Sequence, residues 1–116
     1  SIMNRVFTIG GRAYNIAAPT IKRISLACKE MEAEGIPEGA VDFREMFNGM
    51  KKETLCKVLS LLISGDYSLA TELTQGEKYE LIEPLCVIYE DIEKDMKRIR
   101  QISKQICLLC AKPKVQ

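Results

Sequence analysis

The amino-acid sequence predicts a mainly α protein, with a short N-terminal β-hairpin followed by a helical bundle of four to six helices that ends in one long C-terminal helix. Three observations predict this class. Adjacent glycines separate two short alternating segments near the N-terminus. Apolar residues recur at helical spacing through most of the remaining chain, and one such pattern continues without a break from Leu85 to Cys110.

Length and composition indicate one globular domain, because the chain has 116 residues, of which 47% are hydrophobic and 28% charged. No apolar run reaches the roughly 18 to 20 residues that cross a bilayer, and the N-terminus lacks the pattern of a secretory signal. We therefore expect a cytoplasmic protein with no membrane partner. The expected organisation is a single helical domain over 1–116, with a hairpin at 5–17, a helical part at 20–111 and a flexible tail at 112–116.

The first element is a β-hairpin within Val6–Ile16. A two-residue turn at Gly10-Gly11 requires positive φ, which glycine adopts without strain. This turn places Phe7 opposite Tyr14 and puts four apolar side chains on one face, namely Phe7, Ile9, Tyr14 and Ile16. An isolated two-stranded ribbon is marginal in water, so this face is expected to pack on the helices that follow.

Capping and breaking residues divide the middle of the chain into helices. Thr20 is placed to cap a helix that ends at Gly35, and Asp42 followed by Glu45 starts a short second helix. A third helix carries the strongest apolar stripe, which consists of Leu55, Val58, Leu59, Leu62 and Ile63. This stripe is the expected centre of the core. A short helical turn follows near Leu69–Leu73.

The segment from Leu85 to Cys110 predicts one amphipathic helix about 39 Å long, while a compact domain of this length is roughly 35 Å across. Its apolar positions are 85, 88, 89, 92, 96, 99, 102, 106, 109 and 110. Pro84 either kinks a helix that begins at Glu77 or stands in the first turn of a new helix. A helix of this length carries more apolar surface than so small a bundle can cover, which indicates a scaffold or a binding surface.

Charge changes sign along this helix, although the net charge of the chain is only +1. From Asp66 to Glu93 there are eight acids and one base, a balance of −7, and from Lys94 to Gln116 there are seven bases and one acid, a balance of +6. This order complements the helix macrodipole and is typical of a solvated face. The alternative interpretation is a homo-oligomer in which antiparallel copies pair acidic with basic halves.

Residues suited to catalysis or metal binding are scarce, because the chain contains no histidine, the commonest general base. Cys107-x-x-Cys110 has metal or redox spacing, but it closes a long helix and has no second pair of ligands. We interpret the five cysteines as reduced and buried thiols (Cys28, Cys56, Cys86, Cys107 and Cys110). The acidic residues near Glu90 are interpreted as solvating charges. We expect no enzymatic activity, no catalytic or metal-binding residues and no cofactor.

A basic stretch at 94–104 gives the alternative function, that of a small helical nucleic-acid-associated or regulatory protein. Its residues are Lys94, Lys97, Arg98, Arg100 and Lys104. They offer several phosphate contacts. Aromatic residues for base stacking are missing from the stretch, and the acidic part of the same helix repels a nucleic-acid backbone, so a nucleic acid is the less favoured partner.

The N-terminus also carries a motif known from one family. Its residues are Phe7-Thr8-Ile9-Gly10-Gly11-Arg12-Ala13-Tyr14-Asn15-Ile16, followed by Ala18-Pro19-Thr20-Ile21, which opens a helix. This order resembles the start of small tail assembly chaperone proteins of tailed bacteriophages and prophages. The remainder of the chain agrees with them in size, helical content and lack of catalytic groups, and departs from them in its five cysteines and the length of its last helix.

The resemblance implies a role in phage tail assembly in the bacterial host cytoplasm. Such chaperones bind the long helical tape measure protein before tail tube subunits enclose it. A helical client of this kind fits apolar grooves between amphipathic helices. Methionine side chains near the apolar helix stripes are flexible and adapt to varied partners. Apolar stripes that contain methionine are nevertheless more often buried in the core of their own domain. The candidate partner-binding residues are Ile88, Ile92, Met96, Ile99, Ile102 and Ile106.

Overall fold

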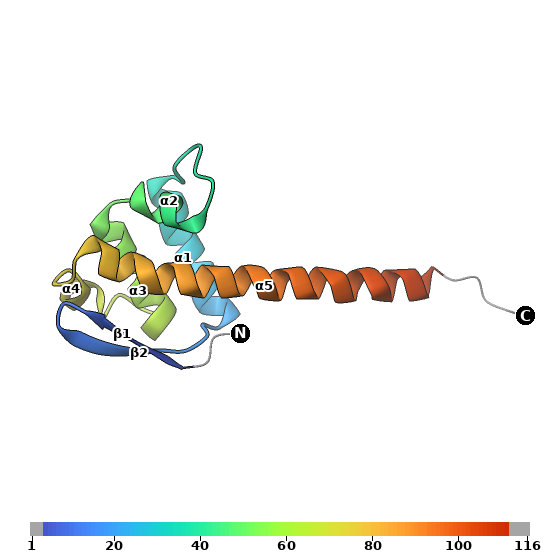
Figure 1. The fold of residues 1–116 in the computed structure, drawn as a ribbon, viewed down its shortest axis with the longest axis horizontal. Helices are drawn as coiled ribbons and strands as arrows, with labels where there is room; N and C mark the ends of the chain where they lie inside the picture. The colour runs from blue at the N-terminus through green and yellow to red at the C-terminus, as the bar shows by residue number, and fades with distance from the viewer. Residues whose placement is uncertain (1–3, 112–116) are drawn as a thin grey trace, which may run out of the picture.

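The computed structural model describes residues 4–111, and the flexible tail expected at 112–116 lies outside the described residues. The described chain folds as an antiparallel hairpin followed by five helices, which confirms the predicted fold class (Figure 1). The elements are β1 (Arg5–Ile9), β2 (Arg12–Ile16), α1 (Ile21–Glu34), α2 (Phe43–Asn48), α3 (Lys52–Ser64), α4 (Ala70–Leu73) and α5 (Lys78–Cys110).

The molecule consists of a globular body, residues 4–95, and a projecting rod, residues 96–110, which is the second half of α5 (Figure 1). Its principal extents are 67 × 31 × 21 Å and its radius of gyration is 17.4 Å, whereas a compact domain of this length has about 13 Å. The 33 residues of α5 measure about 50 Å. The long helix therefore extends far beyond the body, whereas the sequence alone indicated a helix that spans it.

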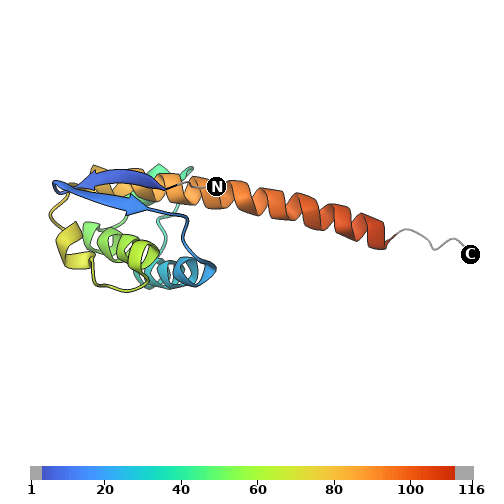
Figure 2. The ribbon, with the colours of Figure 1, turned by 90° about the horizontal axis from the view of Figure 1, so that it is seen from below.

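The body has two layers, which Figure 2 shows edge-on. α1 and α3 lie side by side in one layer, and the hairpin and the first half of α5 form the other. Four residues of the predicted α3 stripe, namely Leu55, Val58, Leu59 and Leu62, are fully buried between the layers. Phe47 from α2 is also buried, with its ring 5.5 Å from that of Tyr89 on α5. The centre of the core is thus where the sequence placed it.

The hairpin has the predicted register, with Phe7 paired to Tyr14 across a turn in which both glycines have positive φ. It packs on the start of α5, where the N–H of Gly10 donates to Oε1 of Glu80 at 3.4 Å. The hydroxyl of Tyr14 donates to Glu72 at 2.8 Å. Burial, and secondly this hydrogen bond, raise the pKa of Tyr14 to about 12. The hairpin therefore joins the body through polar as well as apolar contacts.

Two helices, α1 and α2, begin at the capping residues that the sequence indicated. Thr20 accepts a hydrogen bond from the N–H of Arg23, and Asp42 accepts one from the N–H of Glu45. α5 starts with a capping box in which Glu77 and Glu80 bond each other's backbone N–H groups. Each cap satisfies donors that the first turn of a helix leaves free.

Pro84 lies inside α5, which settles the two predicted alternatives in favour of a helix that begins next to Glu77. Proline has no N–H, so the carbonyl of Glu80 loses its usual partner in the helix. Such an interior proline costs about 3 kcal/mol or more in an exposed helix. Here Pro84 is buried, and its neighbours Leu81 and Leu85 are fully buried as well. Packing against the body therefore offsets the cost of this proline.

The expected burial of the cysteines is right only in part. Cys56 and Cys86 are buried, Cys28 is partly buried, and Cys107 and Cys110 are exposed. Burial raises the pKa of the Cys56 and Cys86 thiols. The expectation was wrong for the last two cysteines, because they lie on the part of α5 that projects beyond the body.

Candidate protein-binding surface

One stripe, apolar at eight of its nine positions, runs along α5, and we call it the seam. Its positions alternate in steps of four and three, and they are Leu81, Leu85, Ile88, Ile92, Asp95, Ile99, Ile102, Ile106 and Leu109. In heptad notation, Leu85, Ile92, Ile99 and Ile106 occupy a, and the others occupy d. Such a 3.5-residue repeat is typical of helices that pack along their length against another helix.

The first half of the seam is the site at which α5 joins the body. Leu81 and Leu85 are fully buried, and Ile88 is 1% exposed. Ile92 is partly buried against the core. Ile88 was predicted to face a partner, but the structure places it inside the core, and Ile92 lies at the edge of the body.

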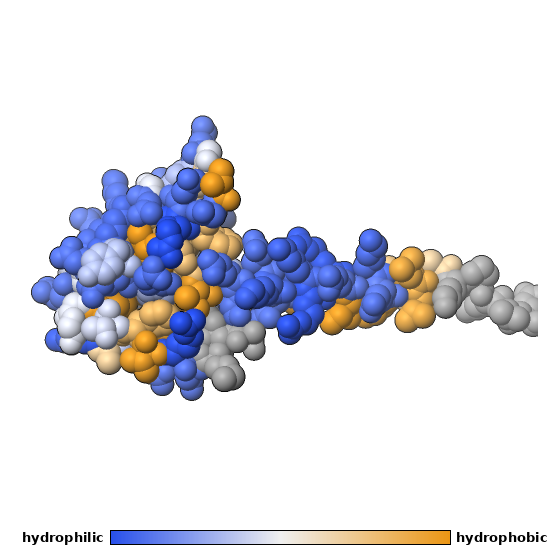
Figure 3. Space-filling view, viewed as in Figure 1, coloured by the Kyte–Doolittle hydropathy of each residue, from blue (hydrophilic) through white to orange (hydrophobic). Residues whose placement is uncertain are grey.

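The second half of the seam has the same chemistry and nothing packed on it in the described chain. We call five side chains the exposed seam, namely Met96, Ile99, Ile102, Ile106 and Leu109, which are 49–64% exposed. Met96 lies beside the a and d line, and the other four lie on it. Figure 3 shows this apolar edge along the outer part of the rod, next to a hydrophilic side. Four of the six predicted partner-binding residues are thus brought together.

The heptad position of Leu109 was the signal that could have added it to the predicted residues. Leu109 follows Ile106 by three residues, the same step that separates Ile99 from Ile102. Helical spacing alone includes Leu109 among the apolar positions of the helix but does not distinguish it from the others. The coiled-coil repeat places it on the line on which a partner would lie.

The basic stretch lies mainly on the other faces of the rod. Lys97 and Lys104 occupy heptad position f, opposite the seam, and Arg100 occupies b. All three are exposed, and Lys97 forms an ion pair with Glu93 at 3.6 Å. An exposed pair of this kind contributes little to stability. These charges keep the rod solvated on one side while its seam stays apolar.

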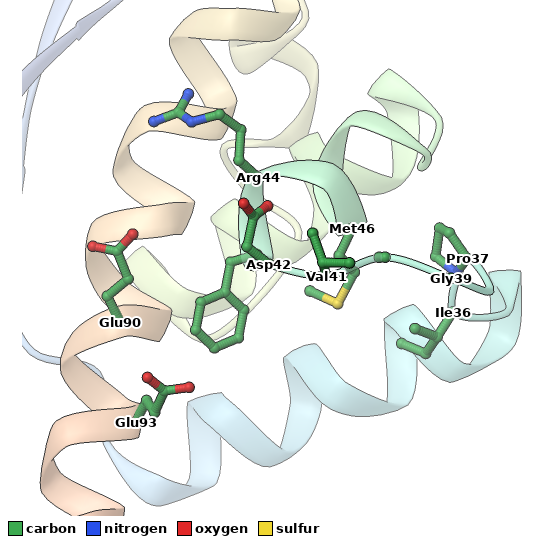
Figure 4. A pocket seen from close by; sticks show the side chains of 11 residues that line it. Ile36, Pro37, Gly39, Val41, Asp42, Arg44, Met46, Glu90 and Glu93 are labelled. Atoms are coloured by element: carbon green, nitrogen blue, oxygen red, sulfur yellow. The ribbon is translucent and has the colours of Figure 1, made fainter.

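A hollow of about 590 Å³ lies between the segment 36–42, α2 and α5 (Figure 4). Ile36 and Val41 stand exposed on it, and Glu90 and Glu93 reach it from α5. Asp42 in its lining is engaged in capping α2. The sequence predicted only that one helix ends at Gly35 and the next starts at Asp42, although apolar residues between them, in a stretch that contains Gly and Pro, were a signal. The lining mixes charged and apolar groups and carries no nucleophile with a base beside it.

Metal-binding arrangements are missing from residues 4–111, since no three His, Cys, Asp or Glu side chains gather there as ligands would. Within the same range, none of the helices is both long and apolar enough to cross a membrane.

The surface that remains is a rod whose apolar seam can pack on another helix. No protein-family model, curated protein or solved structure matches this chain.

Proposed function

We propose that this protein is a non-enzymatic assembly chaperone that holds a helical client protein along the exposed seam. The observation that carries the proposal is a row of five half-exposed apolar side chains on a rod that leaves the body. Because the N-terminus resembles small tail assembly chaperones of tailed phages and prophages, the proposed client is a tape measure-like helical protein. The proposed place of action is the cytoplasm of the bacterial host.

The seam supports reversible binding. Full burial of a large apolar side chain stabilises by about 1.5–3 kcal/mol, so covering the exposed half of each contributes about 1 kcal/mol. Five such side chains contribute about 5 kcal/mol from this surface, and a matching apolar face on the client contributes a similar amount. Association costs at least about 4 kcal/mol. The resulting affinity is modest, which suits a chaperone that must release its client.

A matched pair of variants on the rod tests the proposal. Ile102→Asp places a charge on the exposed seam, and Gln101→Asp places the same charge on the adjacent residue, outside the seam. A tape measure fragment is co-expressed with each variant and with the unaltered protein. We expect the fragment to be soluble with the unaltered protein and with Gln101→Asp, and insoluble with Ile102→Asp.

Two results would contradict the proposal. The first is a fragment that stays equally insoluble with and without this protein. The second is an Ile102→Asp variant that protects the fragment as well as Gln101→Asp does. Retention on DNA that falls steeply with salt, and that weakens when Lys97 and Lys104 are replaced by Gln, would instead support the nucleic-acid alternative. Genes for a tail tube protein and a very long helical protein beside this one would favour the chaperone.

A further inference from the structure

We infer that a second copy of this chain covers the exposed seam when no client is bound, and that the two rods pair antiparallel. This inference goes beyond the proposed function and does not depend on it. It would give the free protein a defined dimeric form, and a client would then compete with the second copy for the same residues. The pattern of the seam, the position of the body and the length of the rod all bear on it.

The seam can pair with itself in an antiparallel register that is apolar at every layer except those with Asp95. In that register Ile99 faces Ile102 of the second copy, and Ile92 faces Leu109 of the second copy. Each a position from Ile92 to Ile106 then meets a d position of the other helix, and the twofold axis lies between residues 100 and 101. A closed, symmetric pair of this kind leaves no seam residue from Ile92 to Leu109 without a facing residue.

The position of the body selects the antiparallel arrangement. The body covers the a and d positions of α5 from Leu81 to Ile88, and a heptad seam turns by only about 20° per repeat on a straight helix. The body therefore lies on the side of α5 toward which the exposed seam faces. Two parallel rods joined by their seams would bring both bodies to the same end and the same side, where they collide.

In the antiparallel arrangement the two bodies lie at opposite ends of the pair. The tip of each rod, at Leu109, reaches the level of Ile92 in the other copy, which is where the body begins. The second helix then continues the line along which the hairpin and α3 pack on the first half of α5 (Figures 1 and 2). The free length of the rod thus matches the length that the second copy covers.

The residues beside the seam bring no like charges together. In this register the nearest flanking pairs are Arg98 with Gln105 of the second copy and Met96 with Ser103 of the second copy. The contact runs over 18 residues, about 27 Å, and is about 10 Å wide. Such a footprint is smaller than a standard interface, so dimerisation is expected at micromolar concentration.

Asp95 is the one polar residue on the seam, at a d position. In the antiparallel register it faces Ile106 of the second copy, so a carboxylate meets an apolar side chain. A carboxylate that loses water without gaining a partner lowers the stability of the pair. We therefore expect the dissociation constant of the Asp95→Leu dimer to be at least tenfold lower than that of the unaltered protein.

Sedimentation equilibrium of the full chain, with a reductant for Cys107 and Cys110, tests the pairing. We expect a monomer–dimer equilibrium in the micromolar range. Ile102→Asp should weaken it at least tenfold and Gln101→Asp should leave it unchanged. Circular dichroism checks that both variants keep the helical content, which is expected because both positions lie outside the body. A protein that stays monomeric at all concentrations, or a dimer that Ile102→Asp does not weaken, overturns the inference.

Disulfide formation tests the orientation. In a background with Cys107→Ser and Cys110→Ser, the variants Ile99→Cys and Ile102→Cys are oxidised separately and as a mixture. Antiparallel pairing predicts a cross-linked dimer that forms in the mixture far more than in either variant alone. Efficient cross-linking of Ile99→Cys with itself indicates parallel pairing and overturns the inference. Because these experiments use the protein without a client, they can fail while the co-expression test succeeds, and the reverse also holds.

Discussion

Two residues of α5 with the same chemistry and the same heptad position should contribute very differently to stability. Ile88 and Ile102 both occupy position d, but Ile88 is 1% exposed and Ile102 is 49% exposed. Replacing a buried isoleucine with alanine removes its apolar contacts and leaves a cavity, which costs about 3 kcal/mol. The same change at a surface position costs within about 0.5 kcal/mol, and the higher helix propensity of alanine offsets part of that. The expected difference between Ile88→Ala and Ile102→Ala is therefore about 3 kcal/mol.

Urea unfolding followed by circular dichroism measures this difference. The protein is kept well below the micromolar dissociation constant expected for the dimer, so that dimerisation contributes little to the measured stability. Ile88→Val, expected to cost about 1 kcal/mol, provides a graded control at the buried site. If Ile102→Ala lowers the free energy of unfolding as much as Ile88→Ala does, the rod packs on the body in solution. The exposed seam, and with it both proposals, would then be refuted.

Three further predictions concern the body. Tyr89→Phe should stabilise the fold by about 1 kcal/mol in thermal melts, because the buried Tyr89 hydroxyl has no hydrogen-bond partner among the described residues. Gly76→Ala should lower the melting temperature, since its new Cβ would meet the buried Ile9 side chain. The pKa of Tyr14, raised to about 12, lies above its unfolded value near 10. Its neutral hydroxyl therefore stabilises the fold below pH 10, and this contribution is lost as the pH rises toward 12. Thermal melts at increasing pH should show this loss in the unaltered protein and not in Tyr14→Phe.

Local signals in the sequence were sufficient to predict the hairpin, the starts of α1 and α2 and the core stripe of α3. Gly10-Gly11 set the hairpin register, and Thr20 and Asp42 marked the helix starts, because each depends on a few neighbouring residues. The α3 stripe marked the core because a helix so apolar on one face must be covered.

The point at which the body ends could not be predicted from the pattern. Ile88 and Ile102 belong to one repeat, and the repeat is the same whether the covering surface comes from this chain or from another. For the same reason the thiols of Cys86 and Cys107 were grouped together, although only Cys86 is buried. What covers an apolar stripe is decided by long-range packing, which periodicity does not record.

A rod that leaves its body has consequences for backbone dynamics. Residues 96–110 form about four helical turns in which every residue is exposed, and isolated helices of about 12–15 residues are only marginally stable in water. Amide protons of the rod should therefore exchange with deuterium in free monomers far faster than those of α3. Any molecule that docks there must also offset the entropy lost when these turns become ordered. Protection from exchange would consequently map, residue by residue, where along the rod a ligand stops.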